Sequence, residues 1–290
     1  MGSGSYSYNS ASIRNSSYYS NADTRQIFSS RKRVTEMDPK NQIRECLETS
    51  EHPETFPIII GLDVTGSMGH IPAHLIKNDF IEIMKKVLEE GIPCPQVCFI
   101  AIGDHECDSA PLQIGQFEAS DELMEKWLTS TYLEGGGGGN SGESYSLAHY
   151  FAARHTSCDA FTKRNKKGLL ITVGDEPTLR NYPKNALTSI FGDGTQTDMS
   201  ATEMLDEARE AWEVYHINIK DYRGRREDVQ SCWKQLLDDH LINVDDNSDS
   251  NVSNVIAALA IKVYKEQYSK AISSSLKVET KLQSTPQQML

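Results

Sequence analysis

The sequence lacks several features that would point to a familiar functional class. No run reaches the roughly 18 apolar residues of a membrane-spanning helix. Residues Met1–Tyr8 are rich in Gly, Ser and Tyr and have no apolar stretch of the kind found in a signal peptide. Basic residues are scarce, because 29 Lys and Arg stand against 41 Asp and Glu and leave a net charge of −12. We therefore expect neither membrane association nor nucleic-acid binding, which needs cationic side chains to displace counterions.

Paired cysteine motifs are also missing. The six cysteines are scattered, and Cys94 and Cys98 have no second pair with which to bind zinc. We expect reduced, buried thiols in a cytoplasmic protein.

The two ends of the chain differ in composition from its middle. Residues 1–30 contain ten Ser and four Tyr and almost no aliphatic side chains, too little apolar surface to offset the entropy of ordering. We expect a disordered Ser/Tyr-rich tail over residues 1–33 and a linker over 34–54 with a short helix around Asn41–Leu47. A polar C-terminal tail is expected over 271–290.

Residues 55–270 alternate between apolar runs and amphipathic segments. The runs at 57–63, 96–103 and 168–174 predict buried strands, with a short edge strand at 111–117. Helices are expected between and after them, among them 143–155 and 184–191. This alternation predicts an α/β fold with a doubly wound, mostly parallel sheet and helices on both faces. Ligands of such sheets bind beyond the carboxyl ends of the strands.

Oxygen-bearing side chains follow three of the predicted elements. Asp63, Thr65 and Ser67 occupy alternate positions after the first strand, Asp175 follows a later strand, and Asn140 ends a glycine run. Carboxylate and hydroxyl oxygens suit Mg²⁺ or another hard divalent ion. Ser and Thr also cap helices, but three separate caps explain the pattern less well than one site.

The sequence Asp63-Val64-Thr65-Gly66-Ser67-Met68 after an apolar strand resembles the metal-ion-dependent adhesion site of von Willebrand factor A (VWA) domains. That motif is Asp-x-Ser/Thr-x-Ser, and the Gly-Ser-Met ending is frequent in intracellular members. The resemblance covers about residues 55–270. It implies that Asp63, Thr65 and Ser67 bind the metal.

The same resemblance suggests where the remaining ligands lie. The family usually supplies a Thr from a later loop, but residues 135–143 contain none, so Asn140 is its replacement, with Ser141 and Glu143 behind it. A cap of the following helix is the alternative role for Asn140. Asp175 matches a second family Asp, although Glu176-Pro177 replaces the usual Gly.

A charged stretch after the second strand, which begins at Asp104 and His105, resembles one found in some intracellular VWA domains. Three roles stay open for it: a polar contact at the rim of the site, a partner that orients the metal ligands, or a separate transition-metal site.

The resemblance implies binding rather than catalysis. A Mg²⁺ ion, or Mn²⁺ or Ca²⁺, would keep residual positive charge and accept an acidic side chain from a partner protein. Intracellular VWA proteins are often adaptors for AAA+ ATPases, so such an ATPase is an expected partner.

Two alternatives stay open. A metal-dependent hydrolase would need a base near the ion, for which Glu143, Glu176 and His105 are the candidates. Because no nucleophile has an evident base, we do not expect an enzyme. A structural scaffold with a vestigial metal site is the other alternative.

Overall fold

A six-stranded sheet forms the centre of the computed structural model, which describes residues 4–66, 68, 70–135, 140, 142–245 and 250–268. The strand order is β10-β9-β6-β2-β3-β4, and all neighbours are parallel except β3 and β4. The strands are β2 (Thr55–Asp63), β3 (Cys94–Ile102), β4 (Leu112–Ile114), β6 (Gly168–Gly174), β9 (Trp212–Lys220) and β10 (Leu241–Asp245).

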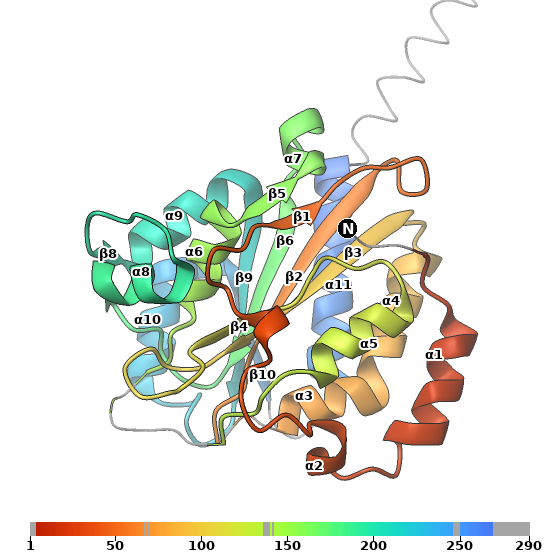
Figure 1. The fold of residues 1–290 in the computed structure, drawn as a ribbon, viewed down its shortest axis with the longest axis horizontal. Coiled ribbons are helices and arrows are strands. Elements are labelled where there is room, and N and C mark those ends of the chain that lie inside the picture. The colour runs from red at the N-terminus through yellow and green to blue at the C-terminus, as the bar shows by residue number, and fades with distance from the viewer. Residues whose placement is uncertain are drawn as a thin grey trace, which may run out of the picture.

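Helices cover both faces of this sheet (Figure 1). One face carries α3 (His70–His74), the π-helical η3 (Leu75–Asp79), α4 (Phe80–Glu89), α5 (Asp121–Thr129) and α11 (Ser250–Tyr268). The other carries α6 (Ser146–Arg154), α8 (Lys184–Phe191), α9 (Ala201–Ala211) and α10 (Glu227–Leu237). The predicted doubly wound α/β fold is confirmed.

The core explains why the apolar runs become strands. Every residue of β2, β3 and β6 is buried, as a strand covered on both faces requires. Alternate side chains then enter two separate apolar clusters: Ile58 and Ile60 lie in one, and Ile59 lies in the other.

The N-terminal segment differs from the disordered tail that we expected over residues 1–33. Its described part forms α1 (Tyr8–Arg14), the π-helical η1 (Asn15–Tyr19) and α2 (Thr24–Ile27), which lie along α4, α5 and α3. The Arg14 guanidinium bonds the buried carboxylates of Asp121 and Glu125, with 2.7 Å from Nε to Glu125 Oε2. The expectation of disorder rested on composition alone. It did not include the ionic pairing with α5, which adds to the few apolar contacts of this segment.

The linker also differs from expectation. Residues 44–46 form strand β1 (Arg44–Cys46), not part of a helix, and pair in parallel with β5 (Thr156–Cys158). Asn41 has a φ of +57°, which a helix does not accommodate, so the expected helix around Asn41–Leu47 is wrong. A 3₁₀ turn, η2 (Thr35–Met37), precedes β1, and the short helix α7 (Asp159–Arg164) follows β5.

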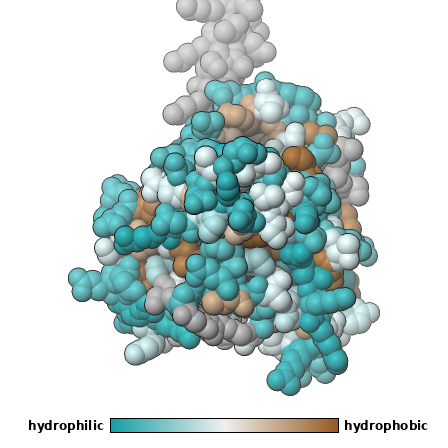
Figure 2. All heavy atoms as spheres, turned by 60° about the vertical axis from the view of Figure 1, so that its left-hand side comes forward, coloured by the Kyte–Doolittle hydropathy of each residue, from teal (hydrophilic) through white to brown (hydrophobic). Residues whose placement is uncertain are grey.

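The remaining short elements complete the surface. Strands β7 (Asn181–Tyr182) and β8 (Met199–Ser200) pair with each other, and the 3₁₀ turn η4 (Asp238–His240) leads into β10. The face shown in Figure 2 is mostly hydrophilic with small, separate apolar patches. In the part of the chain that the structure describes, no helix is both long and apolar enough to span a bilayer. The predicted tail at 271–290 lies outside the described residues.

Candidate metal-binding site

The predicted site residues follow three adjacent strands. In the sheet, β2 lies between β3 and β6, with Asp63 opposite Ile102 and Leu62 opposite Val173. The three strands therefore end at one edge, where Asp63, Asp104 and Asp175 all lie buried. The chain passes from β2 to β3 on one side and later to β6 on the other, so this edge is the topological switch point of the sheet.

Asp63 is fixed in the loop after β2 by short hydrogen bonds. Its Oδ1 accepts from the Thr65 backbone N–H at 2.9 Å and from the Thr65 hydroxyl at 2.7 Å. Its Oδ2 accepts from the Tyr145 hydroxyl at 2.5 Å. Burial raises the pKa of Asp63 to about 6 despite these bonds, because a carboxylate in this environment has lost its water. Ser67, the third predicted ligand of this loop, lies outside the described residues.

Tyr145 is a site residue that sequence reasoning missed. Its ring reaches Asp63 across the end of β6, where a Cβ on Gly174 would lie only 1.8 Å from the Tyr145 oxygen. The glycine at 174 therefore makes room for the phenol. A glycine inside a strand signals such a close approach, but it does not tell which residue approaches.

Glu143 joins the site from the segment after the glycine run. Its backbone bridges to the β6 exit through Pro177 and Leu179, and the next residue, Ser144, donates its N–H to Gly103 after β3. These bonds hold residues 143 and 144 outside α6, which begins at Ser146 and not at the predicted residue 143.

The Glu143 carboxyl lies in a negative environment. Burial, followed by the charges of Asp63 and Asp104, raises the pKa of Glu143 to about 9. Glu143 Oε2 and Asp104 Oδ2 are both buried, and neither has a hydrogen-bond partner among the described residues. A buried carboxylate oxygen without a donor is costly, and a cation would relieve that cost.

His105 lies beside these carboxylates, and its ring is held by contacts with other residues. Its backbone N–H and its ring Nδ1 both contact the Ser144 hydroxyl, at 2.9 Å and 2.8 Å, and its ring stacks on Tyr182. Burial lowers the pKa of His105, although Asp104 acts in the opposite sense. The arrangement places His105 as a packed neighbour of the carboxylates.

Two other predicted residues have different partners. Glu176 is buried but forms ion pairs with Arg223 at 3.2 Å and Arg226 at 3.0 Å. Asn140 donates its side-chain amide to Glu106 Oε2 at 2.7 Å. Ser141, which we placed behind Asn140, lies outside the described residues.

The donors present fit a hard divalent cation. Asp63, Thr65, Glu143 and Asp175 offer carboxylate and hydroxyl oxygens, the ligands preferred by Mg²⁺, Mn²⁺ and Ca²⁺. The part of the chain that the structure describes contains no group of three or more His, Cys, Asp or Glu side chains placed to hold a metal by themselves. Hydroxyls and water would therefore have to complete the coordination.

Two buried histidines are His216, which lies beside Tyr145, and His149 on α6. The His216 ring is 5.2 Å from that of Tyr145, stacks on Trp233 at 3.6 Å and shares a 2.8 Å hydrogen bond with Thr172. Burial lowers the pKa of His216 and brings that of His149 to about 3. Both rings are therefore neutral at physiological pH and bring no positive charge to the carboxylates of the site.

Comparisons with known proteins show the fold. The sequence matches no family model and no curated protein. Among solved structures, it is similar to the pilus adhesin SpaC of Lactobacillus rhamnosus GG, with a TM-score of 0.51 and 12% identity, over 79% of this chain but 31% of that one.

Two VWA structures are similar at lower scores. One is the vWF domain of the type V pili tip protein Mfa5 from Porphyromonas gingivalis, with a TM-score of 0.47 and 11% identity over 74% of this chain and 96% of that one. The other is a von Willebrand factor type A structure from Catenulispora acidiphila, with a TM-score of 0.41 and 11% identity over 80% of this chain and 51% of that one. The structural neighbours thus include VWA domains, and the similarity concerns the fold alone.

Proposed function

We propose that this chain is a protein-binding VWA-type domain in which a divalent cation at the strand exits accepts an acidic group of a partner protein. The observation that carries the proposal is the group of buried acidic side chains around Asp63. Asp63, Glu143 and Asp104 lie together, and the described residues place no Lys or Arg ion pair on them. Carboxylates in this state attract a cation.

Each residue of the proposed site has a separate role. Asp63, Thr65, Ser67 and Asp175 would hold the ion, Glu143 would add charge, and Tyr145 would orient Asp63. The ion would supply residual positive charge and an exchangeable position, because hydroxyl ligands are neutral and Mg²⁺ commonly keeps water ligands. Asn140 as a further ligand stays a prediction, since its amide must first leave Glu106.

Binding is favoured over hydrolysis by the state of two of the three candidate bases, because the proposal gives the third, Glu143, to the ion. Glu176 is neutralised by two arginines, and His105 is packed against Ser144 and Tyr182. A cytoplasmic adaptor role, with an AAA+ ATPase as a partner, remains part of this proposal.

Titration of Mg²⁺ into the purified chain, followed by calorimetry, tests the metal site. Asp63→Ala should weaken Mg²⁺ binding at least about 100-fold, the upper end of losses seen when groups that support ligands are removed. Glu176→Gln is the matched control, because it also removes a buried carboxylate after a strand but one that already has arginine partners. Unchanged Mg²⁺ affinity in Asp63→Ala would refute the site.

The partner requires a second measurement. Affinity capture should recover a protein in the presence of Mg²⁺ that chelation, or Asp63→Ala, releases. A captured protein that stays bound in both conditions would contradict metal-dependent recognition.

A further inference from the structure

The small sheet formed by β1 and β5 aligns two cysteines. Cys46 is the register partner of Cys158, at the end of both strands. The backbones of neighbouring strands lie about 4.7–4.9 Å apart, so register partners approach closely. A disulfide bond needs a Cα separation of about 4.4–6.8 Å, so the strand pairing already supplies the required approach.

The two thiols are neighbours in a buried environment. Cys46 is fully buried, and Cys158 is 7% exposed. Burial, followed by the neighbouring Cys158 thiol, raises the pKa of Cys46 well above its usual range. Both sulfurs are in the thiol form in this structure.

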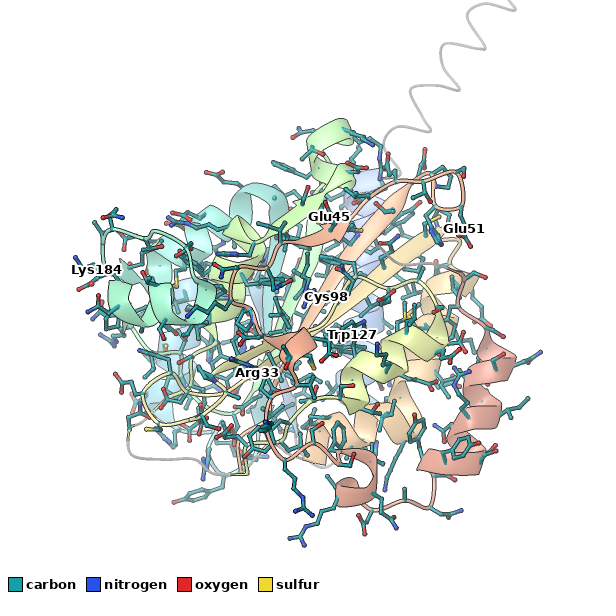
Figure 3. The ribbon with its side chains drawn as sticks, viewed as in Figure 1. Arg33, Glu45, Glu51, Cys98, Trp127 and Lys184 are labelled. Carbon is teal, nitrogen blue, oxygen red and sulfur yellow. The ribbon has the colours of Figure 1, made fainter. Side chains whose placement is uncertain are left out.

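The other cysteines are not matched in this way. Cys98, which is also fully buried, lies opposite Ile59 in the central sheet, and Cys94 lies opposite Thr55. Figure 3 shows Cys98 within the central sheet and Glu45, the neighbour of Cys46, on β1. Among the strands that the structure describes, β1 and β5 are the pair that aligns one cysteine with another.

We propose that Cys46 and Cys158 form an oxidisable dithiol whose disulfide fastens the linker to the α6–α7 connection. A small disulfide such as oxidised glutathione is the oxidant. The Cys158 thiolate, as the more accessible sulfur, attacks it, forms a mixed disulfide and releases one glutathione thiolate. The Cys46 thiolate then attacks the Cys158 sulfur and releases the second. The protein loses two protons and two electrons, and the oxidant becomes two thiols.

The bond would strengthen a junction that weaker contacts now hold. Next to β1, Glu48 receives a 2.6 Å bond from Arg164 and donates its backbone N–H to Asp159 at 2.8 Å. A covalent link at Cys46 would prevent this strand from separating while the thiols are oxidised. The folded segment that precedes β1 would then stay attached through a bond that heating cannot break.

Equilibration of the folded full chain with oxidised glutathione tests the proposal. After unfolding and alkylation, we expect a loss of two of the six reactive thiols and a cross-linked peptide that joins Cys46 to Cys158. The oxidised protein should melt at a higher temperature than the reduced protein, and added dithiothreitol should reverse the shift.

Single substitutions separate this pair from the other cysteines. Cys46→Ser and Cys158→Ser should each abolish the cross-link, whereas Cys98→Ser, the matched control at a buried site, should retain it. Fully alkylated Cys46 and Cys158 after equilibration with excess oxidised glutathione would overturn the proposal, and so would a cross-link that uses a different cysteine.

Discussion

Two regions of this protein, helix α5 and the strand exits, treat their buried carboxylates differently. On α5, Asp121 and Glu125 are 5% and 6% exposed and share the guanidinium of Arg14. At the strand exits, Asp63 and Glu143 are 1% and 5% exposed, and the described residues supply hydroxyl donors to Asp63 but no cationic ion pair. The same kind of side chain has a cationic partner in one place and none among the described residues in the other.

The difference teaches how to separate structural from functional acidic residues. Glu176 follows the same strand as Asp175, yet its two arginines make it a structural ion pair. Burial without a counter-charge costs free energy that hydrogen bonds offset in part and that a cation, or protonation, relieves further. The proposed function therefore gives the uncompensated group at the strand exits to metal binding, and the groups with arginine partners to folding.

Removing the counter-charge of the first region should have the largest effect. Arg14→Ala leaves Asp121 and Glu125 buried without a cation, and should lower the free energy of unfolding by about 2 kcal/mol, less than for a fully buried pair because Arg14 is partly exposed. Arg154→Ala is the matched control. It breaks an exposed pair with Glu207 and should cost about 0–1 kcal/mol in the same urea titration. Equal losses would mean that apolar contacts alone hold the N-terminal segment.

Removing a hydrogen-bond donor from the strand exits should have a smaller effect. That effect should appear in the affinity for the metal. Tyr145→Phe deletes the hydroxyl that fixes Asp63 Oδ2 and should weaken Mg²⁺ binding about tenfold, as is typical of groups that orient a ligand. Tyr182→Phe is the control, because that phenol bonds Thr178 and not Asp63. Equal Mg²⁺ affinity in both variants would show that Thr65 alone orients Asp63.

A pH series of protein stability sharpens the comparison and has the smallest expected effect. Burial, aided by the charge of Arg209, lowers the pKa of His149 to about 3 in the folded state, so the unfolded chain binds more protons as pH falls below about 6.5. Wild type should therefore lose stability relative to His149→Leu, by about 1 kcal/mol per pH unit from pH 6 to pH 5.

The difference in the free energy of unfolding between wild type and His149→Leu also provides an internal control. The raised pKa values of Asp63 and Glu143 act in the opposite sense, but they are common to both proteins and cancel in this difference. Between pH 7.5 and 8.5 the difference should stay constant, since the histidine is neutral in both states. A flat difference from pH 6 to pH 5 would contradict a buried neutral His149.

The sequence predicts the sheet well because apolar runs depend on local composition. Strand β6 and helix α8 have the predicted bounds, Gly168–Gly174 and Lys184–Phe191. Contacts between residues that are far apart in the sequence could not be predicted in this way. Tyr145 meets Asp63 from 82 positions away, and Arg14 meets Glu125 from 111.

The same limit applies to the candidate site. The motif around Asp63 and Thr65 was visible from residue spacing, and the structure places Glu143 near it. The pairing of Glu176 with Arg223 and Arg226 was not visible, because charge in a sequence does not reveal which carboxylates are neutralised in the fold. The ligand roles of Asp175 and Asn140 stay predictions.

The packing of α1 on α5 has a practical consequence for anyone who shortens this protein. A version that starts at Thr55, where the central sheet begins, removes Arg14 together with the buried side chains of Ala11, Ile27 and Phe28. It exposes the apolar surface that they cover. It also leaves two buried carboxylates on α5 without their arginine partner. Truncation at the apparent domain boundary would therefore favour aggregation, and soluble fragments should retain the chain from residue 4 onward.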